Sequence, residues 1–105
     1  MTIKTIGRCL GQANDGSLWF FCKGCDQPHS LKVGSGPGPR WGYNENPEAP
    51  TFTPSVLVRW NEREEAKVCH SFVTDGRIQY LADCTHELAG QTVDLPDWEA
   101  SWSSW

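Results

Sequence analysis

With 105 residues, the chain is long enough for one small domain and too short for two ordinary ones, so its motifs are expected to share one core. The net charge of −4 and the scattered placement of the nine lysines and arginines argue against a nucleic-acid-binding surface, which needs clustered positive charge. No stretch approaches the roughly 18 consecutive apolar residues of a membrane-spanning helix.

The five cysteines favour metal binding over disulfide bonds. Their number is odd, and the N-terminal sequence MTIKTIGRCLG has no apolar run typical of a signal peptide. We therefore expect the protein to be made in a cytoplasm, where thiols stay reduced. Cys9 lies far from the other four in sequence and is interpreted as a small buried apolar residue.

The first predicted elements are two strands that flank a zinc-knuckle turn. The aromatic run SLWFFC predicts a strand at residues 18–22, and residues 30–33 are expected to form its partner. Cys22 and Cys25, separated by Lys-Gly, would then lie in the turn, where backbone N–H groups can point at their sulfurs. His29 follows closely enough to serve as a ligand, although a supporting or exposed position is the commoner place for such a residue.

Residues 34–54 are rich in proline, glycine and asparagine, which predicts an irregular connection without a helix or a central strand. A strand is expected at residues 55–60. The charged run NEREEAK that follows, residues 61–67, is interpreted as a solvated turn region.

Asp75-Gly76 predicts a type I′ hairpin between strands at residues 68–74 and 77–83. The expected register pairs Thr74 with Arg77, Val73 with Ile78, Ser71 with Tyr80 and Cys69 with Ala82. This register makes Cys69 and Cys84 diagonal neighbours at the open end of the hairpin, on one face with Val73, Ile78, Tyr80 and Ala82.

The cysteines together predict one structural zinc site. Its ligands are expected to be Cys22, Cys25 and Cys69 with either Cys84 or His86 as the fourth. The sequence does not decide which of Cys84 and His86 is the fourth ligand. A closed site is the usual role of zinc held by several cysteines, so we assign no catalytic residue and no other cofactor.

Two histidine-containing patterns raise an enzymatic alternative. In ADCTHEL, a carboxylate could act as a base beside a catalytic metal, with His86 oriented by Asp83. His70 is adjacent to Cys69 in a strand and must point to the opposite face, where it is interpreted as a cross-strand neighbour of Leu81.

The last residues form a tryptophan-rich tail. We divide the chain into a zinc-binding β domain, residues 1–95, and a tail, residues 96–105. Trp98, Trp102 and Trp105 are spaced by four and three residues and would share one side of a short helix. This stripe is expected either to cover its own domain or to dock on another protein or a second copy of the chain. The fold class predicted is therefore mainly β, or α+β with one short C-terminal helix.

The segments FFCKGCDQPHSLKV, RWGYNENPEAPTFTPSVLV and VCHSFVTDGRIQYLADCTHELAGQTVDLP together resemble a family of short uncharacterised proteins of tailed bacteriophages and prophages. Some members of that family carry the label ammonia monooxygenase, which does not fit a chain without a membrane span. The resemblance implies a phage protein made in the bacterial host cytoplasm, with a structural or assembly role and possible presence in the virion, and with a phage structural protein as partner. A host-directed binding protein and a zinc-dependent hydrolase are the alternatives.

Overall fold

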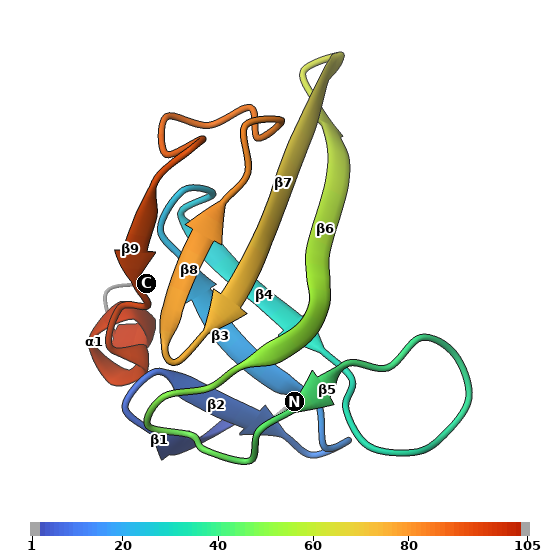
Figure 1. The fold of residues 1–105 in the computed structure, drawn as a ribbon, viewed down its shortest axis with the longest axis vertical. Coiled ribbons are helices and arrows are strands. Elements are labelled where there is room, and N and C mark those ends of the chain that lie inside the picture. Colours follow the sequence, from blue (N-terminus) through green and yellow to red (C-terminus); the bar gives the residue numbers. More distant parts are fainter. Residues whose placement is uncertain (1–2, 104–105) are drawn as a thin grey trace.

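Two antiparallel β-sheets make up most of the protein, as shown by a computed structural model that describes residues 3–103, with only the backbone described for 101–103 (Figure 1). The first sheet consists of β1 (Ile3–Gly7), β2 (Leu10–Ala13), β3 (Leu18–Cys22) and β4 (Gln27–Leu31) in that order. The second consists of β5 (Gly42–Tyr43), β6 (Phe52–Glu62), β7 (Glu65–Thr74), β8 (Arg77–Tyr80) and β9 (Thr92–Asp94), also in chain order. One helix, α1 (Trp98–Ser103), follows, so the predicted mainly β class is confirmed.

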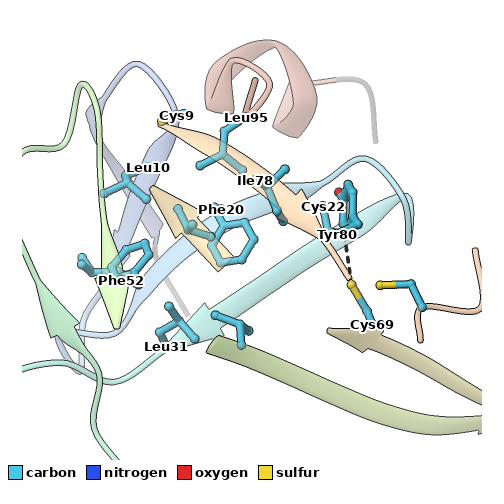
Figure 2. Packing of buried hydrophobic residues seen from close by; sticks show 14 residues of the cluster. Cys9, Leu10, Phe20, Cys22, Leu31, Phe52, Cys69, Ile78, Tyr80 and Leu95 are labelled. Carbon is cyan, nitrogen blue, oxygen red and sulfur yellow. Dashed lines mark hydrogen bonds between the residues drawn. The ribbon is translucent and has the colours of Figure 1, made fainter. Parts of the chain in front are cut away.

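The hydrophobic core lies between the two sheets, because both contribute side chains to one buried cluster (Figure 2). Phe20 of β3 and Phe52 of β6 stack across the core with ring centroids 6.3 Å apart. Cys9, in the turn after β1, is fully buried in this cluster, as predicted, and its burial raises the pKa of the thiol. One end of the core is occupied by Cys22, Cys69 and Tyr80 (Figure 2).

The first sheet follows the prediction at β3 and departs from it at β4. The β3 bounds are those expected, and the knuckle turn joins it to β4. However, β4 starts at Gln27 because Cys22 already pairs with Gln27 across the turn. The second strand predicted at 30–33 is therefore shifted, and Val33 makes only an isolated bridge to Trp41.

Strand β6 begins inside the segment predicted to be irregular, which corrects that interpretation. Phe52 pairs with Val73 of β7 on one side, and Tyr43 of β5 pairs with Phe52 on the other. The β6–β7 register shifts between Phe52 and Val56, so residues 53–55 form a bulge. Pro54 fits into a strand between two neighbours because a bulged residue need not donate a ladder hydrogen bond.

The charged run at residues 61–67 is the tip of a long hairpin rather than a separate turn region. Strand β6 extends to Glu62 and β7 starts at Glu65, and these two residues pair. Arg63 and Glu64 have φ values of 50° and 68°, the positive values that both central residues of a type I′ turn require. The run is solvated, as predicted, because most of its side chains are exposed.

The Asp75-Gly76 hairpin is confirmed near its turn and ends earlier than predicted. Thr74 pairs with Arg77, Val73 with Ile78 and Ser71 with Tyr80, as expected. Beyond Tyr80 the strand stops, and residues 82–83 form a turn. The predicted pairing of Cys69 with Ala82 is therefore wrong, and Ala82 is exposed instead of facing the core.

The C-terminal helix packs on the first sheet through Trp98, which is 2% exposed. Its indole lies so close to Gly11 of β2 that a Cβ at Gly11 would come within 2.7 Å of it, so this contact needs a glycine. The Trp102 side chain and Trp105 lie outside the described residues, and docking of the tryptophan stripe on a partner stays a prediction. Within residues 3–103, no helix is long and apolar enough to cross a membrane.

Candidate functional site

Strand β7 carries two neighbouring residues that face two different groups of polar side chains. Cys69 points into the core and is 1% exposed, whereas the side chain of the next residue, His70, is 25% exposed on the outer face. Alternation along a strand requires this division, as the sequence predicted. We describe the inner group as the thiol cluster and the outer group as the serine–histidine–aspartate group.

The thiol cluster, formed by Cys22, Cys25, His29 and Cys69, could hold a metal ion because its four candidate ligand atoms lie within 4.8 Å of one another. The sulfurs of Cys22 and Cys69 are 3.7 Å apart. Two sulfurs bound tetrahedrally at about 2.3 Å from zinc would be separated by roughly 3.8 Å, so the spacing fits. The backbone N–H of Cys25 donates to the Cys22 sulfur at 3.4 Å, which is the expected knuckle geometry.

His29 is the member of the cluster for which the sequence analysis considered ligation but favoured a supporting or exposed position. It lies on β4 opposite Phe20, is 6% exposed, and its ring meets the Phe20 ring edge to face with centroids 5.7 Å apart. Its Nε2 atom is buried and has no hydrogen-bond partner among the described residues. A buried nitrogen normally has a partner, so an unpaired one among three thiols fits metal ligation.

The thiols of the cluster compete for negative charge. Hydrogen bonds from Cys25 and then Cys69 lower the pKa of Cys22, whereas the same contact with Cys22 raises the pKa of Cys25 to about 12. The pKa of Cys69 is also raised, first by its hydrogen bond with Cys22. One thiolate is thus stabilised at the expense of the others, and a bound cation would favour all of them as thiolates.

Tyr80 supports the cluster from the second sheet. Its hydroxyl accepts a hydrogen bond from the Gly24 N–H at 3.1 Å and lies 3.2 Å from the Cys22 sulfur. Burial raises the pKa of this phenol, so it stays neutral and can donate to the Cys22 thiolate.

Cys84 and His86, the predicted alternatives for the fourth ligand, form a second group that could hold a metal ion, and this group shares Cys69 with the thiol cluster. The Cys84 sulfur lies 3.2 Å from both the backbone nitrogen and the backbone oxygen of His70. The Nδ1 atom of His86 accepts from the Leu88 N–H at 3.2 Å, and its Nε2 is buried without a partner among the described residues. Cys84 leaves the predicted diagonal position because the chain turns after Tyr80 instead of continuing as a strand.

On the outer face, Ser55, His70 and Asp83 form a continuous line of polar contacts. His70 Nδ1 lies 3.1 Å from Asp83 Oδ2, and His70 Nε2 lies 3.0 Å from Ser55 Oγ. This is the arrangement of an activated serine nucleophile, in which a histidine base is oriented by a carboxylate. The Asp83 side chain is 57% exposed, so the far end of the line is solvated.

Ser55 reaches His70 because of the bulge in β6. The regular ladder resumes at Val56, which pairs with Ser71, and Leu57 pairs with His70. Ser55 is therefore the last bulged residue before the ladder, next to the strand that carries His70. The Trp41 indole N–H donates to the Ser55 carbonyl oxygen at 3.2 Å and holds the bulged backbone. Bulges commonly re-aim a side chain next to an active site.

Asp83 reaches His70 because the chain turns back after β8. The N–H of Leu81 donates to the His70 carbonyl at 2.9 Å, so the two residues are neighbours, but Leu81 lies beyond the end of β8 and is not the cross-strand partner that was predicted. The Cys84 N–H then donates to the Leu81 carbonyl at 3.2 Å and closes a turn with Asp83 inside it. Asp83 therefore contacts His70 rather than His86, the partner considered from the sequence.

Exposed apolar side chains lie beside the serine–histidine–aspartate group. Leu57, two residues after Ser55, is 43% exposed, and Phe72, two residues after His70, is 41% exposed. Side chains two apart in a strand share a face, so both belong to the outer face of the second sheet. A hollow of about 230 Å³ adjoins Phe72 and is lined by Thr74, Arg77 and Thr92, among others.

A comparison with family models gives one match, over residues 4–81, to a family described as "Bacterial ubiquitination-like system serine protease (BubE)". The match includes Ser55 and His70 and ends two residues before Asp83. No curated protein and no solved structure matches the chain.

This match overturns the predicted function. The prediction of a phage structural or assembly component, with a host-directed binder or a zinc-dependent hydrolase as alternatives, is wrong, because the matching family is described as a serine protease. No match bears on the resemblance to phage proteins, which stays a prediction. Because the match covers well over half of its residues, the chain belongs to the family of bacterial ubiquitination-like system serine proteases.

Proposed function

We propose that the protein is a serine protease in which Ser55 is the nucleophile, His70 the general base and Asp83 the residue that orients His70. The observation that carries the proposal is the pair of contacts through His70, at 3.0 Å to Ser55 Oγ and 3.1 Å to Asp83 Oδ2. The family description supports the same reaction class independently. The substrate class proposed is a polypeptide of a bacterial ubiquitination-like system, in keeping with that description.

The two contacts of His70 support the following proton transfers. Asp83 accepts from Nδ1–H and so leaves Nε2 free to accept the Ser55 hydroxyl proton. As that proton moves, Ser55 Oγ bonds to the carbonyl carbon of the scissile amide. The protonated His70 then donates to the leaving amine as the carbon–nitrogen bond breaks, which gives an acyl-enzyme. A water molecule, deprotonated by His70, hydrolyses the acyl-enzyme and restores the Ser55 hydroxyl.

The outer face carries exposed apolar side chains on both strands next to Ser55, which suits binding of an extended polypeptide. Leu57 and Phe72 are exposed on either strand beside the nucleophile, and apolar substrate side chains could be partly buried against them. Burial of apolar area stabilises by roughly 25 cal/mol per Å², so these contacts would supply binding without charge recognition.

We further propose that the thiol cluster binds one zinc ion with a structural role. Zinc fits a set of three thiols and one imidazole with tetrahedral spacing, and the three cysteines form no disulfide that would compete with metal binding. Bound zinc would cross-link the two sheets, because Cys22 and His29 belong to β3 and β4 whereas Cys69 belongs to β7. All four candidate positions are taken by protein, so no position is left for a water nucleophile.

Labelling by a fluorophosphonate tests the protease proposal without a known substrate. This probe phosphonylates only serines activated by a base. We expect one adduct on Ser55, located by peptide mass spectrometry, and none in Ser55→Ala. Ser30→Ala removes an exposed serine of β4, which belongs to the other sheet, and is the matched control, which should label normally.

The proposal is wrong if the folded, metal-loaded wild type does not react, or if Ser55→Ala reacts as fast as wild type. Elemental analysis of protein purified without a chelator tests the zinc proposal separately. We expect one zinc per chain, and a different metal or none would contradict it.

A further inference from the structure

The edge of β7 beyond the end of β8 is completed by side chains and by the backbone N–H groups of Leu81 and Thr85, which donate to the carbonyls of His70 and Val68, instead of by a regular strand. Strand β8 stops at Tyr80, so the backbone groups of Val68 and His70 on that edge have no regular strand beside them. Unpaired buried backbone groups are costly, so their partners identify what holds this part of β7.

Cys84 and Thr85 supply these partners. The His70 N–H donates to the Cys84 sulfur, and the Cys84 thiol donates to the His70 carbonyl, both at 3.2 Å. The Val68 N–H donates to Thr85 Oγ1 at 3.0 Å, and the Thr85 hydroxyl donates to the Val68 carbonyl at 3.3 Å. Each side chain thus bonds both backbone groups of one β7 residue and replaces one residue of a strand.

The turn that carries Asp83 is consequently attached to His70 at both ends. Before Asp83, the Leu81 N–H donates to the His70 carbonyl at 2.9 Å. After Asp83, the Cys84 sulfur holds the same residue through its N–H and carbonyl. The turn that carries the Asp83 carboxylate is therefore bonded to the backbone of His70, the residue whose imidazole Asp83 contacts. Because Asp83 itself is more than half exposed, packing alone does not hold it there.

We propose that Cys84 is a positioning residue of the serine–histidine–aspartate group, with Thr85 in support, and that it is not a metal ligand. The proposal rests on the proposed protease function for its effect on the reaction. Its structural part, the bond between the Cys84 thiol and the His70 backbone, does not depend on that function. Cys84 also belongs to a group with Cys69 and His86 that could hold a metal ion, but its sulfur already donates to and accepts from the His70 backbone. The thiol cluster has four candidate ligands without it.

The test compares Cys84→Ala with Cys84→Ser in the full chain. Alanine removes both bonds to His70, whereas a serine hydroxyl can donate to the carbonyl and accept from the N–H. We expect Cys84→Ala to slow fluorophosphonate labelling of Ser55 by about 10- to 100-fold, the size of effect caused by small misplacements of reacting groups. Cys84→Ser should recover most of the rate, and both variants should keep the metal content of the wild type.

Amide hydrogen exchange at His70, monitored by NMR, tests the bonds between the Cys84 thiol and the His70 backbone directly. We expect faster exchange in Cys84→Ala and near wild-type exchange in Cys84→Ser. Thr85→Val is the second variant for the case in which Cys84→Ala fails to fold. It should accelerate exchange at Val68 and slow labelling by a smaller factor, with the metal retained.

The positioning role is overturned if both Cys84 variants lose the metal, since Cys84 would then be a ligand. It is also overturned if folded Cys84→Ala keeps wild-type labelling and wild-type exchange at His70, or if Cys84→Ala does not fold and Thr85→Val changes neither measurement. Failure of the protease proposal gives a different pattern, in which the wild type itself is not labelled while Cys84→Ala still accelerates exchange at His70.

Discussion

The two faces of β7 place different chemistry on adjacent residues. Inward, Cys69 belongs to a buried thiol cluster, and outward, His70 belongs to a solvated serine–histidine–aspartate group. The inner group joins the two sheets, and the outer group lies on one sheet only. A group that holds the fold can be buried, whereas a group that reacts with a polypeptide must be accessible to that polypeptide at the surface.

The two groups also differ in how the chain builds them. The thiol cluster uses regular features, namely the ends of two paired strands, their tight turn and the inward face of a third strand. The outer group uses irregular features, because Ser55 lies in a bulge and Asp83 in a turn that follows an early strand end. We therefore expect changes in the inner group to affect folding and changes in the outer group to affect the reaction.

The largest expected effect is that of removing an inner ligand. Cys22→Ser should lose the metal and unfold, because a structural zinc contributes on the order of 10 kcal/mol to folding in small zinc peptides. A typical domain has only about 5–15 kcal/mol of stability in total. Elemental analysis and circular dichroism measure both losses. Cys9→Ala, which removes a fully buried thiol outside the cluster, should keep the metal and is the matched control. A folded Cys22→Ser protein with an unchanged melting temperature would show that the cluster does not hold the fold.

The second prediction compares the loss of two histidines, His70 of the outer group and His29 of the thiol cluster. His70→Ala should lower the rates of substrate cleavage and of labelling by the probe by about 10⁴-fold or more, as expected when a triad base is removed. The variant should keep the metal and the fold. His29→Ala should instead weaken metal binding and lower the melting temperature. Labelling kinetics and metal content, measured on both variants, check the pair. If His70→Ala lost the metal, or His29→Ala kept it with unchanged affinity, the division of roles between the two faces would be wrong.

The third prediction concerns the exposed end of the outer group. Asp83→Asn should slow the reaction by about 10²-fold, which is less than the roughly 10⁴-fold lost when a fully buried triad aspartate is replaced. The smaller factor is expected because the Asp83 side chain is 57% exposed and its charge is partly screened by water. Rate constants for labelling of Ser55 measure the effect. An unchanged rate would mean that Asp83 does not orient His70.

The smallest expected effect is that of replacing Ser71, a serine near Ser55 that does not belong to the outer group. Ser71 is fully buried on the inner side of β7, and its hydroxyl has no hydrogen-bond partner among the described residues. Ser71→Ala should therefore raise the free energy of unfolding by roughly 1 kcal/mol, because it removes a buried unpaired polar group. Labelling should be unaffected. Thermal unfolding checks the sign, and a lower melting temperature would indicate that the hydroxyl has a partner.

The sequence was informative where local chemistry is strong. The Asp75-Gly76 turn determined a hairpin whose first pairs are as expected, and the strand at 18–22 and the knuckle of Cys22 and Cys25 are also as predicted. Cysteines are rare and their spacing is distinctive, so the inner cluster could be assembled from the sequence except for His29. That residue was considered as a ligand but not included, because a supporting or exposed position is commoner for a histidine that follows a knuckle.

The outer group could not be assembled from the sequence for physical reasons. Serine is common, and Ser55 follows Pro54, which was interpreted as the last residue of an irregular connection rather than as part of a bulge in a strand. Asp83 was expected to continue a strand, and in that register it would lie beside Val68 rather than His70. Both errors are shifts of one or two residues in strand register. Tertiary contacts of Cys84, Thr85 and Trp41 determine that register. The predicted function was wrong because it rested on the resemblance to phage proteins and on the metal cluster, while the outer group was not recognised in the sequence.

A crystal structure of the fluorophosphonate-treated protein, with anomalous data at the zinc absorption edge, tests the central claim most directly. We predict phosphonate density on Ser55 Oγ, on the outer face of β7, and one zinc peak among Cys22, Cys25, His29 and Cys69, on the inner face. A zinc peak at His70, a zinc peak that includes Cys84 as a ligand, or an adduct on a different serine would contradict the account.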